Sequence, residues 1–434
     1  MLWEAFIGGQ YQALSKVQNG DVAANIYTET RAVEGSPKEK TFYGTPGPTL
    51  FATAATNSTR GWFSQDGRTW VTVGPTLYEV NVTTAALTAI GTIPDDGKPV
   101  YYASNGKGGD ELGVVGGGQL AVLDLVSGVF TSPVTLPFSN PVTMTFLDGY
   151  ALINQRDTPT IWFSALEDML TWDALDFIAR SGSSDNIVAI AGTRDRVWAL
   201  GTKTTSQFYD SGDVDTPFLP YPGTTFQIGL VNPYALAVDN DVLTWIATRA
   251  KAAPSVVRTE DGVPQTISTP PISAFLRRCT TLDDAEALYY EQDEHPFAIF
   301  TCPSSPDDIK TYAYDGLEGL WHTRSTWNTT TGRHGRWRAR GCTVVGSQVF
   351  VGDFASGALY TLKLDVYTDA GGIIRRERTA PYPSAENQWL FLDQVELGME
   401  AGVGISSGQG SEPVAELQIS RDGTKTWESA GFGQ

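Results

Sequence analysis

The sequence feature that most constrains the fold is a weak internal repeat of seven units. Each unit pairs two apolar strand-like segments, and the second of these often carries an aromatic residue before a polar turn. One marker residue per unit shows the repeat: Tyr78, Ala121, Trp162, Phe208, Val256, Tyr312 and Tyr360, with spacings of 43, 41, 46, 48, 56 and 48 residues. Several short strands in each repeat of about 40–50 residues are typical of β-propeller blades. We therefore predict an all-β fold, a β-propeller with seven blades, with six as the alternative.

The predicted strands and turns agree with this fold. The strand before each marker is expected at residues 69–73, 112–115, 151–153, 197–200, 243–246, 297–300 and 349–351. Five Asp-Gly pairs lie between strand-like runs, at 66–67, 148–149, 261–262, 315–316 and 422–423. Asp-Gly favours a type I′ hairpin turn, because both central residues need positive φ. Only residues 164–169 have a helix-like start, and we interpret them as a short surface turn.

The two ends of the chain fall outside the repeat. We predict an N-terminal arm at 1–45, a propeller at 46–364 and a C-terminal β-sheet domain at 365–434. Alternating residues indicate C-terminal strands near 374–378, 389–397 and 414–419, with a glycine-rich loop at 402–410. The arm and the C-terminal segment are expected to form a small platform sheet together.

Charge and cysteine content narrow the function. The net charge of −19 argues against sequence-specific DNA binding, because the chain repels nucleic acid at long range. An acidic wall would still let DNA slide past without adhering. The three cysteines show no CxxC spacing, so neither a zinc site nor a disulfide framework is indicated, and a reducing compartment is expected for folding. We expect no secretory signal and no membrane span, since no apolar run reaches about 18 residues.

No catalytic, cofactor-binding or metal-binding residues are predicted. His295, His322 and His334 lack metal-ligand spacing and are interpreted as surface or turn residues. The glycine-rich stretches 106–109 and 116–118 lack the strand-to-helix context of a phosphate loop and are expected at hairpin tips.

Two segments resemble the Asp-box turn of propeller proteins. Residues 420–427 (SRDGTKTW) carry Asp422 and Trp427, and residues 64–70 (SQDGRTW) carry Asp66 and Trp70. In such a turn the carboxylate caps backbone amides and the Trp packs beneath, so a structural role is expected. Sialidases also carry these turns, which makes a glycosidase the enzyme alternative. That chemistry needs several Arg residues and carboxylates around one pocket, and no such Arg set is evident.

One basic cluster could dock a partner. It contains Arg333, Arg336, Trp337, Arg338 and Arg340. Strand alternation would place Arg336, Arg338 and Arg340 on one face, opposite Trp337. Docking to a protein partner is the favoured interpretation. Stacking on nucleic acid, a strand that forms salt bridges to an acidic neighbour, and a solvated face are the alternatives.

Several ordered segments resemble the packaged-DNA stabilisation proteins of short-tailed bacteriophages, which form the tail hub or nozzle. These segments are 25–29 (NIYTE), 229–236 (GLVNPYAL), 320–325 (LWHTRS), 335–339 (GRWRA), 351–360 (VGDFASGALY), 367–371 (YTDAG), 375–381 (RRERTAP) and 392–404 (LDQVELGMEAGVG). The resemblance is most specific in the C-terminal third.

The resemblance implies a structural virion protein, not an enzyme, assembled in the bacterial host cytoplasm. It implies a homo-hexameric ring below the portal or adaptor ring, with tail fibre or needle proteins docked on it. Packaged double-stranded DNA would be retained and then ejected through its channel, and we expect lumen-facing loops to be net acidic. We expect the arm and the C-terminal sheet to form the ring contacts, because an open sheet has edges to pair. A carbohydrate-binding or sialidase-like propeller and a generic protein-interaction propeller remain the alternatives.

Overall fold

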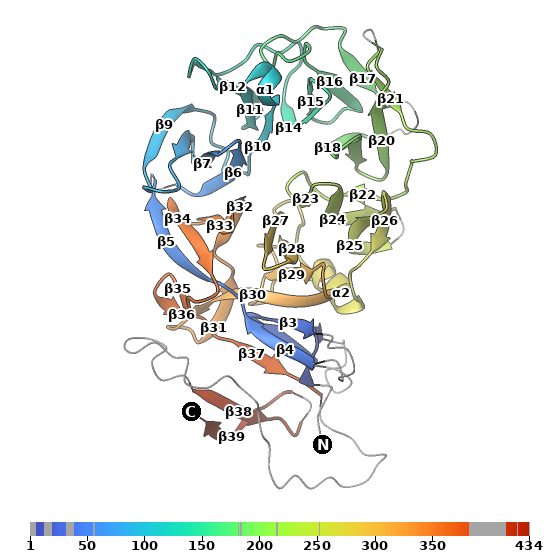
Figure 1. The fold of residues 1–434 in the computed structure, drawn as a ribbon. Helices are drawn as coiled ribbons and strands as arrows, with labels where there is room; N and C mark the ends of the chain where they lie inside the picture. The colour runs from blue at the N-terminus through green and yellow to red at the C-terminus, as the bar shows by residue number, and fades with distance from the viewer. Residues whose placement is uncertain are drawn as a thin grey trace.

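The computed structural model describes residues 6–12, 20–31, 39–54, 57–180, 182, 185–213, 216–250, 252–381, 414–422 and 424–433. Seven antiparallel sheets stand around a ring, each forming one blade, and the arm and C-terminal strands lie together on one side of it (Figure 1). The β-propeller prediction is confirmed, with seven blades in the described residues.

The first four blades each contain four consecutive strands. Blade 1 contains β6 (Thr59–Gln65), β7 (Arg68–Val73), β8 (Thr76–Val80) and β9 (Leu87–Thr92). Blade 2 contains β10 (Tyr101–Ser104), β11 (Glu111–Gly116), β12 (Gln119–Asp124) and β13 (Phe130–Thr131). Blade 3 contains β14 (Pro141–Leu147), β15 (Tyr150–Gln155), β16 (Thr160–Phe163) and β17 (Phe177–Ala179). Blade 4 contains β18 (Ile187–Gly192), β19 (Val197–Gly201), β20 (Thr205–Asp210) and β21 (Phe218–Pro220).

The last three blades depart from this plan. Blade 5 splits its first strand and contains β22 (Gly229–Leu230), β23 (Leu236–Asp239), β24 (Val242–Arg249), β25 (Ala252–Glu260) and β26 (Val263–Thr266). Blade 6 contains β27 (Glu286–Gln292), β28 (His295–Thr301), β29 (Thr311–Asp315) and the long β30 (Leu320–Asn328). Blade 7 contains β32 (Ala339–Val345), β33 (Gln348–Asp353), β34 (Ala358–Lys363) and β5 (Gly47–Thr53). Because β5 precedes blade 1 in sequence, its pairing with β34 closes the ring.

The sequence repeat matches the blades strand by strand. All seven marker residues lie in the third strand of a blade, and all seven preceding segments lie in the second strand. The core lies between blades: Trp70 and Leu77 of blade 1, for example, pack with Leu112 and Leu123 of blade 2. Similar apolar layers join each later pair of blades and return to blade 1. Each blade therefore buries its apolar faces only against its neighbours, which is why the repeat requires a closed ring.

Three of the five Asp-Gly pairs form the predicted turn. Positive φ occurs at both residues of 66–67, 148–149 and 261–262. The prediction is wrong for Asp315-Gly316, where neither residue has positive φ and the turn runs to Gly319. The reason is that Asp315 uses its carboxylate instead, and Oδ1 accepts the Leu317 amide at 2.9 Å. Gly423 lies outside the described residues, so the Asp422-Gly423 pair stays a prediction; the Asp422 carboxylate accepts the Lys425 and Thr426 amides.

Two helices occur among the described residues. One turn, α1 (Gly106–Gly109), forms the tip of the β10–β11 hairpin, and residues 117–118 form the tip of the β11–β12 hairpin, as predicted. The other, α2 (Pro270–Arg278), joins blades 5 and 6 and was not predicted. This helix begins with two prolines, whose rings fix φ near the helical value. It buries Ile272, Phe275 and Leu276. Residues 164–169 form a turn, in agreement with the prediction.

The terminal segments share a sheet that continues blade 6. In the arm, β1 (Tyr11–Gln12) pairs with β2 (Gly20–Ala24), and β3 (Ile26–Arg31) pairs with β4 (Glu39–Gly44). Strand β2 pairs with β37 (Glu377–Thr379) and, through Ala24 and Thr323, with β30. Strand β31 (Arg333–Arg336) also joins β30.

The remaining C-terminal strands form two separate hairpins. One pairs β35 (Thr368–Asp369) with β36 (Gly372–Ile373), and the other pairs β38 (Ala415–Ile419) with β39 (Glu428–Gly433). The predicted strand at 389–397 and the loop at 402–410 lie outside the described residues. The three domain boundaries stay a prediction.

Candidate assembly site

The arm meets the propeller where β2 lies beside β30 and β37. We call this region the arm junction, and it comprises the described parts of residues 6–46, residues 318–340 and residues 367–381. Hydrogen bonds join the three segments directly: Gln10 N donates to Trp321 O at 2.6 Å, and Asn25 N donates to Thr323 O at 2.8 Å. The Thr30 amide and hydroxyl both donate to the Glu318 carboxylate, at 2.8 and 2.7 Å. The arm is thereby held along its length.

Asn25 connects all three segments of the arm junction. Its Nδ2 donates to Ser325 O at 3.1 Å and to Arg375 O at 2.8 Å, and its Oδ1 accepts the Ser325 amide at 2.9 Å. Its φ of 56° lies in the left-handed region, which Asn tolerates better than most residues. This side chain is buried, so its loss would leave buried backbone groups of β30 without partners.

Arginines of the C-terminal segment bind the arm backbone. Arg378 donates from Nε to Phe6 O at 2.6 Å, and from Nη1 to Gly9 O and Val22 O at 3.2 Å each. Burial lowers the pKa of Arg378 from its usual value. Arg376 donates to Thr45 O at 3.3 Å, at the other end of the arm. Two neighbouring cations therefore clamp the arm at both ends.

The predicted docking cluster forms ion pairs inside the subunit. Arg336 and Arg340 share one carboxylate, that of Glu286, at 2.5 and 2.7 Å. Arg338 pairs with Asp353 at 3.1 Å and with Asp369 at 2.9 Å, and these carboxylates raise the pKa of Arg338. Trp337 is buried.

Strand alternation therefore does not determine the directions in which these arginine side chains point. The chain leaves β31 at Arg336 and enters β32 at Ala339, so Arg338 points to different acids than Arg336 and Arg340 do. The geometry agrees with the alternative of a strand that forms salt bridges to acidic neighbours. Arg333 alone of the five has a mostly exposed side chain, at 70%.

The histidine prediction is wrong, because His295 and His322 are buried. His295 Nδ1 lies 2.7 Å from Asp315 Oδ2. Arg324 Nε donates to His322 Nε2 at 3.2 Å, and burial together with the Arg324 charge holds the pKa of His322 well below its usual value. The ring of Tyr27, from the arm, packs on both histidines. Sequence spacing missed this group because its members come from four strands.

Arg324 is a fully buried cation surrounded by aromatic rings. Its guanidinium carbon lies 4.6 Å from the centre of the Phe297 ring and 5.1 Å from those of Tyr290 and Trp337. It also donates a hydrogen bond to the Tyr290 hydroxyl. Cation–π contacts are strongest where water is excluded, so this Arg stabilises the boundary between blades 6 and 7.

A second contact between a histidine and a carboxylate lies at the arm junction. His334 Nε2 lies 3.2 Å from Glu377 Oε1, and this contact is the main cause that lowers the pKa of Glu377. Arg375 also pairs with Glu377 and stacks on Trp327 at 4.5 Å. The prediction of a surface or turn residue is wrong for His334 as well, since it lies in strand β31 and its side chain is only 10% exposed.

The two Asp-box turns differ. Asp422 accepts the Lys425 and Thr426 amides at 3.0 and 2.9 Å, and these bonds and the Thr426 hydroxyl lower its pKa to about 2. Thr424, which replaces the usual Gly, has a φ of 67°. Trp427 is 42% exposed, whereas Trp70 is buried after the Asp66 turn.

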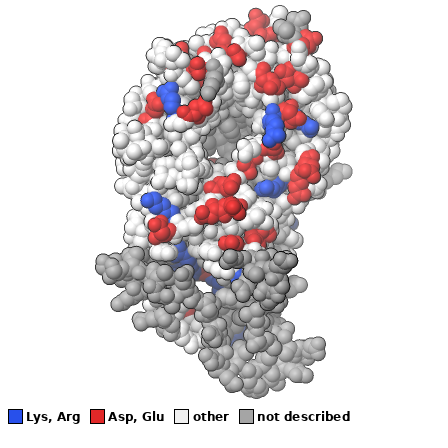
Figure 2. Space-filling view, viewed as in Figure 1, with Lys and Arg blue, Asp and Glu red and all other residues white. Residues whose placement is uncertain are grey.

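Asp and Glu side chains are more numerous than Lys and Arg on the face of the propeller seen in Figure 2. The turn between the first and second strands carries an aspartate in six of the seven blades: Asp66, Asp110, Asp148, Asp195, Asp241 and Asp293. Desolvation and the neighbouring carboxylates of Asp210 and Asp195 raise the pKa of Asp148, which shows that these turns interact across blades. Two of these aspartates have arginine partners in the blade 4 turn: Asp241 pairs with Arg194 at 3.7 Å and Asp195 pairs with Arg196 at 3.4 Å. Other arginines are paired internally, such as Arg60 with Asp96 at 2.7 Å.

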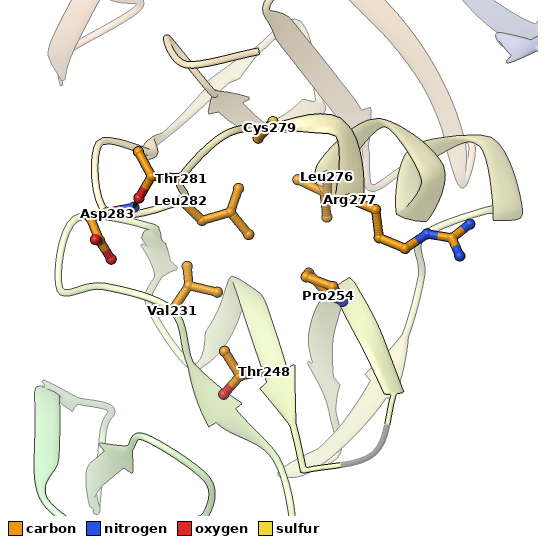
Figure 3. A pocket seen from close by; sticks show the side chains of 9 residues that line it. All are labelled: Val231, Thr248, Pro254, Leu276, Arg277, Cys279, Thr281, Leu282 and Asp283. Carbon is orange, nitrogen blue, oxygen red and sulfur yellow. Dashed lines mark hydrogen bonds between the residues drawn. The ribbon is translucent and has the colours of Figure 1, made fainter. Parts of the chain in front are cut away.

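A pocket of the described chain lies elsewhere, between α2 and blade 5 (Figure 3). It has a volume of about 390 Å³ and is lined mainly by apolar side chains, with Arg277 and Asp283 at its rim. It does not bring together the several Arg residues that a sialidase site requires. Within the described residues no group of three or more His, Cys, Asp or Glu side chains could hold a metal ion. No helix there is long and apolar enough to cross a membrane.

Fold and site together define a structural class: a seven-bladed β-propeller with a strand arm clamped onto its sixth blade. A family model described as "Bacteriophage P22 Gp10, beta-propeller" matches residues 18–367. This chain belongs to that family of phage structural proteins, which confirms the resemblance seen in the sequence.

Other comparisons are more distant. No curated protein matches the chain. Among solved structures, the computationally designed Ika8 protein has 10% identity and a TM-score of 0.40, over 72% of this chain and 99% of its own. The N-terminal domain of Nup159 has 12% identity and a TM-score of 0.44, over 79% and 98%. The extracellular domain of BT4673 from B. thetaiotaomicron has 9% identity and a TM-score of 0.47, over 73% and 39%. TM-scores below 0.5 support no conclusion about this chain.

Proposed function

We propose that this protein is a non-enzymatic hub of a short phage tail, assembled as a ring of six copies below the portal. The ring would retain packaged DNA, guide it during ejection and provide a docking platform for fibres or a needle. The observation that carries this proposal is membership of the phage Gp10 propeller family over residues 18–367.

The arm junction supports the assembly part of the proposal. Here the chain holds a sheet outside the closed propeller, and β1 and β31 are strands at its margins. Sheet margins can pair with another chain, whereas blades that face each other in a closed ring have few free edges. We therefore place the contacts between subunits at the arm and the C-terminal segment, with Arg333 as the remaining candidate for partner docking.

The acidic turn face supports the DNA part. Carboxylates on six blades would repel phosphates, so a channel bordered by this face would not bind DNA tightly. This orientation of the propeller in the ring is part of the proposal.

Native mass spectrometry of the purified full-length protein tests the assembly. A hexamer, or a hexamer formed on adding the portal ring, is the expected result. A protein that stays monomeric in both conditions would favour the generic protein-interaction propeller. In a parallel experiment, retention of double-stranded DNA at low salt by the assembled ring would contradict the repulsive channel.

A further inference from the structure

The pocket beside α2 contains a reactive group that the proposed tail function does not use. Cys279 follows the last residue of α2 and lines the pocket (Figure 3). Cys279 is half-buried, whereas Cys302, which follows blade 6 strand β28, is fully buried. Both are free thiols.

The two thiols are neighbours in space although 23 positions separate them in sequence. Cys279 packs against the apolar cluster that contains the buried Cys302, and its thiol donates to Phe275 O at 3.6 Å. Thr280 N donates to Ser304 O at 3.3 Å, so the backbones that follow each cysteine also lie side by side. Ser304 Oγ donates to Asp284 Oδ2 at 2.5 Å and fixes the same two loops together.

The surroundings give the two sulfurs different chemistry. The neighbouring Cys302 thiol and Ser305 hydroxyl lower the pKa of Cys279, although burial opposes them. The Cys279 neighbour and burial raise the pKa of Cys302. The half-buried sulfur is thus the one that ionises first, and the thiolate is the nucleophilic form of cysteine.

We propose that Cys279 and Cys302 form a thiol–disulfide exchange site that takes small disulfides of the glutathione class. The Cys279 thiolate attacks one sulfur of the small disulfide through the pocket, which forms a mixed disulfide and releases one thiolate. Cys302 then loses its proton to the medium, and its sulfur attacks the Cys279 sulfur and displaces the second thiolate. Two protein thiols and one small disulfide thereby become one protein disulfide and two small thiols.

The product would tie the end of α2 to the end of β28. Reducing conditions keep the two thiols free, so the bond would form only where disulfides are available. Hydrogen bonds already hold the two flanking loops beside each other.

Incubation of the reduced full-length protein with oxidised glutathione tests this site, with intact mass, thiol counting and peptide mapping as readouts. The expected result is the loss of two hydrogens and of two of the three thiols, with a Cys279–Cys302 crosslink. Cys302→Ser should accumulate a glutathione adduct on Cys279, and Cys279→Ser should react at least tenfold more slowly. Cys342→Ser is the matched control and should behave like the wild type, because burial raises the pKa of Cys342 to about 12.

Three results would overturn the proposal. In the first, the wild type keeps a glutathione adduct and forms no crosslink. In the second, the folded wild type stays unreacted while the urea-unfolded protein reacts. In the third, Cys279→Ser still loses two thiols at the wild-type rate. The crosslink in the wild type is read directly, so the test does not depend on either variant folding.

Discussion

Replacing Arg378 with Met should release the N-terminal arm while leaving the propeller intact. Met keeps much of the apolar volume of the side chain but removes its hydrogen bonds to the carbonyls of Phe6, Gly9 and Val22. Hydrogen bonds to a charged group contribute about 1.5–3 kcal/mol each. The arm junction is only partly buried, so water would replace some of them, and we expect a net loss of about 3 kcal/mol in the free energy of arm opening.

A loss of about 3 kcal/mol corresponds to about a hundredfold rise in the open population of the arm, since about 1.4 kcal/mol is tenfold. Hydrogen exchange measures this directly, because amides exchange through local opening. Peptides that cover residues 6–12 and 20–31 should exchange about a hundredfold faster in the variant, and peptides of residues 111–124 in blade 2 should not change.

Arg194→Met provides the matched control. The Arg194 side chain is 86% exposed, and its ion pair with Asp241 is 3.7 Å long, so exchange should stay within about threefold of the wild type. An Arg378→Met arm that exchanges less than tenfold faster, or a blade 2 that accelerates equally, would refute the clamp.

Three further perturbations test the junction and the ring. Asn25→Gly and Asn25→Ala both remove the side-chain hydrogen bonds, so each should lower the free energy of unfolding in urea by about 3 kcal/mol. Asn25→Ala should cost about 1 kcal/mol more than Asn25→Gly, because the φ of residue 25 is 56°. Equal losses for the two variants would contradict the strained backbone. Since the pKa of His322 is held well below its unfolded value, stability should fall as pH drops below about 6.5, by up to about 1.4 kcal/mol per unit. His322→Gln should remove that slope between pH 7 and 5, and an unchanged slope would show that His322 does not carry it. Gly352→Ala would place a Cβ 2.1 Å from the Thr59 hydroxyl between blades 7 and 1, and should lower the free energy of unfolding by about 1–3 kcal/mol. In the control Gly431→Ala the added Cβ meets nothing within 4 Å, so the free energy of unfolding should change by no more than about 0.5 kcal/mol. Similar losses for the two variants would argue against tight packing between blades 7 and 1.

The acidic composition illustrates a partial prediction. The net charge of −19 suggested an acidic wall, and the sequence contained every aspartate that the wall needs. It could not show that six blades place an aspartate at the same turn, because that follows from the alignment of strands around the ring. Nor could the sequence show that cations such as Arg60 form ion pairs within the propeller.

The basic cluster illustrates a site that sequence alone assigned differently. Four arginines and Trp337 suggested partner docking, and the spacing of Arg336, Arg338 and Arg340 suggested one face. The interruption between β31 and β32 ends that alternation, and Glu286 from blade 6 lies between two of the three arginines. A partner 50 residues away in sequence decided the role of Arg336.

The sequence by itself determined the blades. Strand period, Asp-Gly turns and repeat spacing are local properties, and each blade must bury two apolar faces that only similar neighbours can cover. The tertiary structure alone decided what the polar residues do. Closure of the ring through β5 and β34, the burial of His295, His322 and Arg324, and the clamping of the arm by Arg378 all join residues that lie far apart in the chain. The physical reason is that a side chain acquires its charge state and partners from its surroundings, and those surroundings exist only after the blades have closed into a ring.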